Sequence, residues 1–248
     1  MRTESFATPG AVELTIEVPA GAVEIEAVET TETTVELEAR GRDAEEFERE
    51  VRIEARPRGE GQEVVVDASA RRGLLGFREG EYRVRIKTPG GAIVRADLAS
   101  ADIRGRGRFG SLAIDVASGD VNFDEVAGEA KINTASGDVE LRRVGSARVN
   151  SASGDVRIDD SGPVEANTAS GDIVLRRIAS GEVKVHSASG DVEVGIAKGS
   201  RLWVDAQSLS GDTSSELELE TAPSGADEGP LVELRAQTMS GDISVRRA

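Results

Sequence analysis

The sequence predicts an all-β protein, a parallel β-solenoid with coils of about 17–19 residues that follows a β-rich N-terminal cap. Three observations predict this fold. One tripeptide recurs at near-constant spacing, apolar and polar residues alternate on both sides of each copy, and the intervals are too short for a helix between strands. Only 3% of the 248 residues are aromatic, so the core must be built from Val, Ile, Leu and Ala.

The recurring tripeptide is Ser-Gly-Asp, preceded by a degenerate copy at Ser100-Ala101-Asp102. Seven full copies begin at Ser118, Ser136, Ser153, Ser170, Ser189, Ser210 and Ser240. From Ser100 onward, successive starts are 18, 18, 17, 17, 19, 21 and 30 residues apart. A repeat this regular indicates one structural unit per copy.

Alternation around each copy predicts two strands joined by a tight turn. Around Ser153, for example, Ala147 and Val149 precede the turn, and Val156 and Ile158 follow it, with polar residues between them. This period of two is typical of half-buried strands. A looser turn would then lead into the next copy. These turns are predicted at Val144-Gly145-Ser146, Asp160-Ser161-Gly162-Pro163, Ala179-Ser180-Gly181 and Lys198-Gly199-Ser200. Two strands in about 17 residues leave no room for a crossover helix, so equivalent strands must stack in parallel.

Residues 1–90 alternate as well but have no clear period, and we expect them to form the cap and the first, degenerate coils. A short helix is predicted over Asp43–Arg49 with Asp43 as its N-cap, and a loop over Arg71–Gly80. The regular repeat domain is expected over residues 91–248. Residues 216–230 are predicted to be an insertion in its last coil that folds over the C-terminal edge.

The turns are predicted to be structural. Gly can adopt a positive φ, while Ser and Asp side chains hydrogen-bond to the backbone of a tight turn. The residues concerned are Gly119, Asp120, Gly137, Asp138, Gly154, Asp155, Gly171, Asp172, Gly190, Asp191, Gly211, Asp212, Gly241 and Asp242. The alternative is a column of carboxylates that binds calcium. Calcium-binding solenoids carry more Gly and Asp per coil, so we predict no metal and no cofactor.

A second column, three residues before each Ser, is entirely polar and is expected to face outward. Its members are Asp97, Asp115, Asn133, Asn150, Asn167, His186, Gln207 and Gln237. We select Asn133, Asn150, Asn167, His186 and Gln207 as candidate binding residues, because a polar face repeating every ~4.8 Å suits a repetitive ligand such as a glycan. Stacked Asn side chains can also hydrogen-bond to one another without any ligand. Ice binding would need outward Thr, whereas Thr134, Ser151 and Thr168 fall on the inward phase.

Several functions are disfavoured. The chain has no Cys, and its only His, His186, has no Ser or Cys partner in a recognisable motif, so we predict no catalytic residues. The glycine pattern at residues 105–110 precedes a predicted strand instead of the helix that dinucleotide binding requires. A net charge of −16 argues against nucleic acid as a binding partner. The sequence also has no apolar run long enough to insert into a membrane. With no leader pattern either, we expect a cytoplasmic protein, and cell-surface association stays open.

The forms INTASGDVEL, VNSASGDVRI and ANTASGDIVL resemble the bacterial and archaeal "putative adhesin" family of domains of unknown function. The resemblance covers nearly the whole chain. It implies a right-handed β-solenoid with no established catalytic residues. The expected function is a non-catalytic structural or binding module that presents a repetitive polar face to a protein, glycan or other polymer, or that self-associates through its terminal coils. The alternatives are a carbohydrate-active β-helix enzyme and calcium-dependent surface adhesion.

Overall fold

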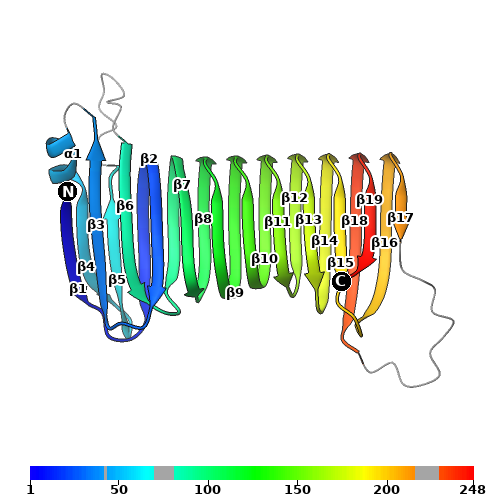
Figure 1. Ribbon diagram of the computed structural model, residues 1–248, viewed down its shortest axis with the longest axis horizontal. Helices are drawn as coiled ribbons and strands as arrows, with labels where there is room; N and C mark the ends of the chain where they lie inside the picture. Colours follow the sequence, from blue (N-terminus) through cyan, green and yellow to red (C-terminus); the bar gives the residue numbers. More distant parts are fainter. Residues whose placement is uncertain (42–43, 70–80, 216–228) are drawn as a thin grey trace. The chain divides into compact units, whose positions relative to one another are not determined.

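The computed structural model describes residues 1–41, 44–69, 81–215 and 229–248 (Figure 1). The chain forms two compact units, an N-terminal unit of Met1–Gly128 and a C-terminal unit of Glu129–Ala248, and β9 (Val121–Ser136) leads from one to the other. Both are built from stacked parallel strands, which confirms the all-β, solenoid-like fold predicted from the repeat. None of the described helical residues forms a segment long and apolar enough to cross a membrane.

The coils of the N-terminal unit are stacked on β2 (Val12–Val28). This strand pairs in parallel with β7 (Ile93–Phe109), which in turn pairs with β8 (Ser111–Ser118). Inward residues such as Leu14 and Val94 lie opposite each other and are fully buried. Burial of such aliphatic side chains stabilises the stack by about 1.5–3 kcal/mol each.

On its other edge, β2 pairs in parallel with two strands of the predicted cap, β5 (Gly61–Asp67) and β6 (Glu81–Pro89). The remaining cap strands run antiparallel to their neighbours: β4 (Arg52–Arg58) pairs with β5, β3 (Glu32–Arg40) with β6, and β1 (Arg2–Ala7) with β3.

The predicted short helix is present as α1 (Ala44–Glu50), whose Phe47 packs against Tyr82 with 6.4 Å between ring centroids. Asp43, its predicted N-cap, and the predicted loop at residues 71–80 lie outside the described residues.

The glycine-rich segment at residues 105–110 has a packing role. Phe109 and Phe123 meet edge to face with ring centroids 5.2 Å apart. A Cβ on Gly105 would lie 2.2 Å from the ring of Phe123, so the glycine makes room for this aromatic pair. The strand β8 follows this segment, as the sequence predicts.

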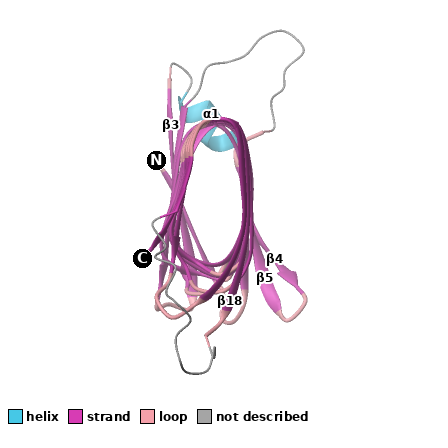
Figure 2. Cartoon of the chain, turned by 90° about the vertical axis from the view of Figure 1, so that its right-hand side faces the viewer, coloured by secondary structure: helices cyan, strands magenta, loops and turns pink. Residues whose placement is uncertain are grey.

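The C-terminal unit repeats one coil in register. It begins with the second half of β9 and continues with β10 (Val139–Ser153), β11 (Val156–Ser161), β12 (Val164–Ser170), β13 (Ile173–Ile178), β14 (Gly181–Ser189) and β15 (Val192–Ile196). Viewed end-on, the coils form flattened rings with two long sides (Figure 2). One long side includes the parallel pairs β10–β12 and β12–β14, and the other includes β11–β13 and β13–β15. Inward residues such as Val149, Ala166 and Val185 are fully buried.

The looser turns are less distinct than predicted. β10 runs without a break through the predicted turn at Val144-Gly145-Ser146, and Val144 pairs with Ser161 of β11. The corner thus keeps an extended, hydrogen-bonded backbone because the next coil pairs with it. Strands do end at Ser161, Ile178 and Ile196, close to the other predicted turns.

The order of the last two coils differs from the sequential stacking we predicted. The terminal coil is β16 (Arg201–Ser210) with β17 (Thr213–Ser215), and the inserted coil is β18 (Leu231–Ser240) with β19 (Ile243–Arg247). β18 pairs with β14 on one side and β16 on the other, and β19 lies likewise between β15 and β17 (Figure 1). The last coil in the sequence is therefore not the last in the stack.

Side-chain chemistry explains this order. At the inward positions after the turn, the inserted coil has Ile243 and Val245, which are 0% and 2% exposed. The terminal coil has Thr213 and Ser215 at the paired positions, and both are exposed. Placing the more apolar coil inside buries more hydrocarbon and leaves the hydroxyls in water. Of the predicted insertion, residues 216–228 lie outside the described residues, while the carbonyl of Pro230 accepts a 2.9 Å hydrogen bond from Arg201 N–H.

Candidate functional site

The Ser-Gly-Asp turns depend on glycine for two reasons. The seven turn glycines, at positions 119, 137, 154, 171, 190, 211 and 241, have φ values between 128° and 151°. Such φ values strain any residue that has a Cβ. The coils also approach closely here, since a Cβ on Gly154 would lie 2.2 Å from the carbonyl oxygen of Gly137.

The turn aspartates form a ladder between coils. The N–H of Asp155 donates to Oδ1 of Asp138 at 2.9 Å, and the N–H of Asp172 donates to Oδ1 of Asp155 at the same distance. The row continues through Asp191 and Asp242 to Asp212 at 2.8 Å per step. Asp120 makes the equivalent bond to Asp102 within the N-terminal unit, at 3.0 Å. In this row a carboxylate oxygen accepts a backbone hydrogen bond. No group of three or more His, Cys, Asp or Glu side chains among the described residues is arranged to hold a metal ion.

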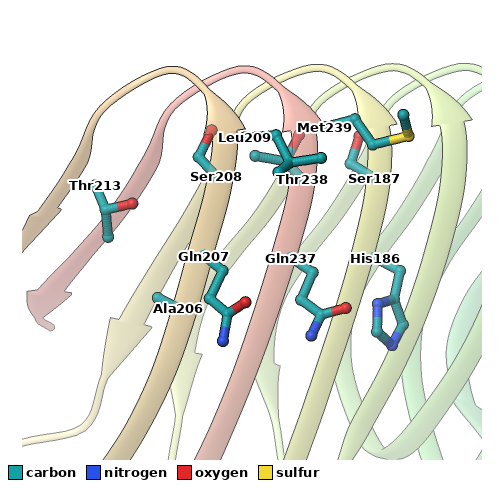
Figure 3. A pocket seen from close by; sticks show the side chains of 10 residues that line it. All are labelled: His186, Ser187, Ala206, Gln207, Ser208, Leu209, Thr213, Gln237, Thr238 and Met239. Atoms are coloured by element: carbon teal, nitrogen blue, oxygen red, sulfur yellow. The ribbon is translucent and has the colours of Figure 1, made fainter.

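The candidate binding residues form one row on a long side of the C-terminal unit. We call it the polar column: Asn133, Asn150, Asn167, His186, Gln237 and Gln207, in spatial order. The structure brings together all five residues selected from the sequence. It also places Gln237 between His186 and Gln207 (Figure 3), an order that follows from the inserted coil and that sequential stacking does not predict.

Hydrogen bonds hold the first half of the polar column. Nδ2 of Asn150 donates to Oδ1 of Asn133, and Nδ2 of Asn167 to Oδ1 of Asn150, both at 2.9 Å. The three Asn side chains are half-buried, whereas His186, Gln237 and Gln207 are exposed. An Asn amide has two donors and a carbonyl oxygen with two lone pairs, so this ladder does not use all of its hydrogen-bonding capacity.

The hydroxyl residues beside the polar column point inward, as predicted. Thr134, Ser151 and Thr168 are only 7–8% exposed. The hydroxyl of Thr168 donates to the carbonyl of Ser170 at 3.1 Å. These hydroxyls do not belong to the outward surface, so ligand contacts on this side must come from the polar column and its outward neighbours.

Charged side chains flank the polar column in pairs. Arg148 contacts Glu165 at 3.1 Å, and Glu182 contacts both Lys184 at 2.9 Å and Arg235 at 2.7 Å. The hydrogen bond from Lys184 is the main reason that the pKa of Glu182 is lowered. These salt bridges hold the charged side chains beside the amide side chains of the polar column.

Sequence reasoning assigned no site role to the aromatic residue next to the polar column. The guanidinium of Arg235 lies 5.5 Å from the ring centroid of Trp203, and the indole side chain is 48% exposed. The two residues are 32 positions apart and meet because the inserted coil lies beside the terminal coil. Spacing in the sequence could not have indicated this contact.

The end of the polar column borders an open depression of about 640 Å³. Its lining includes His186, Gln237 and Gln207 and two exposed apolar side chains, Met239 and Leu209 (Figure 3). The preceding coils have Ala at the corresponding position, one residue before Ser. The depression combines amide and imidazole hydrogen-bonding groups with an apolar rim, which suits binding more than proton transfer.

A cluster around the buried Glu63 in the N-terminal unit also escaped sequence reasoning, because it joins the pair of strands β4 and β5 to Thr15 of β2, 48 positions before Glu63. Glu63 is 4% exposed and accepts hydrogen bonds from Arg56 at 2.8 Å, Arg58 at 3.0 Å and Thr15 at 2.7 Å. The bonds from Arg56 and Thr15 lower the pKa of Glu63 to about 2. A carboxylate held so firmly in its charged form stabilises the cap strands.

Comparison with known proteins gives matches over nearly the whole chain. The family model described as Toastrack DUF4097 matches residues 11–246. A solved structure described as a "putative adhesin" from Bacteroides fragilis NCTC 9343 is 11% identical with a TM-score of 0.52, covering 100% of this chain and 96% of that one. A "putative lipid binding protein" from Parabacteroides distasonis ATCC 8503 is 13% identical with a TM-score of 0.48 and the same coverage. At these identities the likeness concerns the fold alone. None of the curated proteins matches the sequence significantly.

Proposed function

The chain belongs to the Toastrack DUF4097 family, and we propose that it is a non-catalytic binding module. It presents the polar column to a repetitive polymer, most simply a glycan. The observation that carries this proposal is the column itself: six hydrogen-bonding side chains from successive coils in one register on one long side.

The spacing of the polar column supports a repetitive ligand. Neighbouring strands lie about 4.8 Å apart, so each coil offers the same groups at a fixed step. Amides donate and accept hydrogen bonds, as do sugar hydroxyls. The ladder through Asn133, Asn150 and Asn167 orders these side chains before any ligand arrives, which lowers the entropic cost of binding.

The arrangement of the turn carboxylates favours binding over glycoside hydrolysis. Glycoside hydrolysis needs one pair of carboxyl groups at a defined separation, about 5–5.5 Å or 6.5–9.5 Å. Here the Asp side chains repeat evenly, and Asp138, Asp155 and Asp172 accept backbone hydrogen bonds from the next coil. This arrangement favours a structural use of the row.

Co-sedimentation with insoluble peptidoglycan, chitin and cellulose, followed by a soluble glycan array, tests the proposal. The double variant Asn150→Lys, Asn167→Lys should lose at least tenfold in affinity, roughly 1.4 kcal/mol, because it breaks the ladder and crowds the column. The matched control Val174→Lys, Ser244→Lys adds the same charge to half-buried positions on the opposite long side, in β13 and β19. Equal binding by both double variants would argue against the polar column.

A further inference from the structure

The terminal coil has a free backbone edge. Among the described residues, β16 pairs with β18 and β17 with β19, each on one side only. Arg201 N–H points toward the side of β18 and donates to the carbonyl of Pro230, the residue just before that strand. Since the backbone groups of successive residues in a strand point to opposite edges, those of Leu202, Val204 and Ala206 point away from β18. An edge of this kind is a template for another strand.

The ladder of turn aspartates ends at the same edge. Asp191 accepts from Asp242, and Asp242 accepts from Asp212, both at 2.8 Å. Within the described part of the chain, no group donates to the carboxylate of Asp212. Gly241 N–H donates to Ser210 O at 3.1 Å, so by the same repeat Gly211 N–H points toward the free edge. The terminal coil therefore offers acceptors and donors where an interior coil would meet its neighbour.

The terminal coil also exposes apolar side chains that interior coils bury. Val204 is 40% exposed, while Leu234, its partner in the inserted coil, is 0% exposed. Leu202 is half-buried, whereas its partner Val232 is 0% exposed. A strand added at this edge would cover both side chains and gain about 25 cal/mol for each Å² of apolar surface removed from water.

We propose that this edge is an interface for a second copy of the chain, with the terminal coils of two copies meeting across a two-fold axis and β16 of each copy running antiparallel to that of the other. The inserted coil supports this occupant. It pairs with the coil of β14 and β15, from which the whole terminal coil separates it in the sequence, so pairing follows register and alternation and does not need a direct chain connection. A two-fold contact uses the same patch on both copies, and the coil in a second copy that offers this free edge is again the terminal coil.

Light scattering after gel filtration, over a hundredfold range of concentration, tests the interface. The mass should rise from 26.1 kDa to twice that value and stop there. A monomer at every concentration would overturn the proposal. This is also the result expected if another segment of the same chain covered the edge. Growth beyond a dimer would overturn it too, because it would indicate head-to-tail stacking.

Two variants locate the contact. Ala206→Pro removes an N–H at the free edge and spares the bonds to β18, and Val204→Lys puts a charge there; either should weaken dimerisation roughly tenfold or more. The control is Leu209→Lys, in the same coil, because Leu209 lies on the outward phase and is 82% exposed. It should dimerise like the wild type. Loss of the dimer in Leu209→Lys but not in Val204→Lys would overturn the proposal.

Circular dichroism and melting of each variant show that the fold is retained. The pair Asn150→Lys, Asn167→Lys should still dimerise, so failure of the interface and failure of polymer binding are separable. The dimer and the polar column are independent, since the column faces outward from the long side and the interface lies at the edge of the terminal coil.

Discussion

The cap of the N-terminal unit and the terminal coil of the C-terminal unit end a stack of parallel coils in different ways. In the cap, β1, β3 and β4 reverse direction, and inward residues such as Leu37 and Val64 are 0% exposed. In the terminal coil the strands stay parallel, the inward residues after the turn are Thr213 and Ser215 in place of aliphatic residues, and Val204 is left 40% exposed. The last coil of a stack exposes inward apolar side chains. In the N-terminal unit the cap strands cover them, whereas in the C-terminal unit polar residues replace some of them. In the cap, antiparallel strands pair with the sides of β5 and β6 that face away from β2, whereas among the described residues β16 is paired on one side only.

The largest loss of folding stability should come from replacing a glycine in the turn of an interior coil. Gly154→Val should destabilise by about 3 kcal/mol or more, because a Cβ would lie 2.2 Å from the Gly137 carbonyl at a φ of 128°. Gly211→Val meets the same clash with Gly241 but in a coil that has a neighbour on one side only, so it should cost less. Urea denaturation of both variants measures the difference. Equal losses would mean that the terminal coil is held as firmly as an interior one.

A smaller loss of stability is expected from a substitution in the inserted coil, and almost none from the reverse substitution in the terminal coil. Ile243→Thr should cost about 2–3 kcal/mol, because it removes buried hydrocarbon and buries a hydroxyl at a position that is 0% exposed. Thr213→Ile, at the paired position of the terminal coil, should change stability by less than ~0.5 kcal/mol. Thermal melting of the two single variants is the measurement. A large loss from Thr213→Ile with none from Ile243→Thr would contradict the order of coils described here.

The sequence predicts the repeating part of this fold well and its two ends poorly, for a physical reason. Inside the repeat, each coil meets copies of itself, so alternation and the Ser-Gly-Asp spacing are enough to predict register, the inward aliphatic residues and the outward Asn ladder. At the ends, the neighbour of a strand is decided by competition between segments. Nothing in the local pattern of Leu231–Arg247 says that it enters before the terminal coil; only the comparison of Ile243 with Thr213 does. The contact of Arg235 with Trp203 and the hydrogen bond between Thr15 and Glu63 depend in the same way on strands that are far apart in the sequence.

The smallest effect concerns acid stability and again contrasts the two units. Glu63, in the cap, has a pKa of about 2 against an ordinary value of 4.5. A carboxylate whose pKa is lowered by folding stabilises the folded state above pH ~4.5, and this contribution is lost as the pH falls toward ~2. Glu63→Gln should therefore cost roughly 2 kcal/mol at neutral pH, where it removes the charged partner of the Arg56 salt bridge and one of the two carboxylates that Arg58 contacts, and much less near pH 2. Glu182→Gln, beside the polar column, is the control. Its carboxylate is exposed and shared with Lys184 and Arg235, so it should change stability little at any pH. Denaturation of both variants between pH 2 and 7 makes the comparison, and a loss from Glu63→Gln that does not shrink toward acid would show that the cluster does not titrate as its contacts predict.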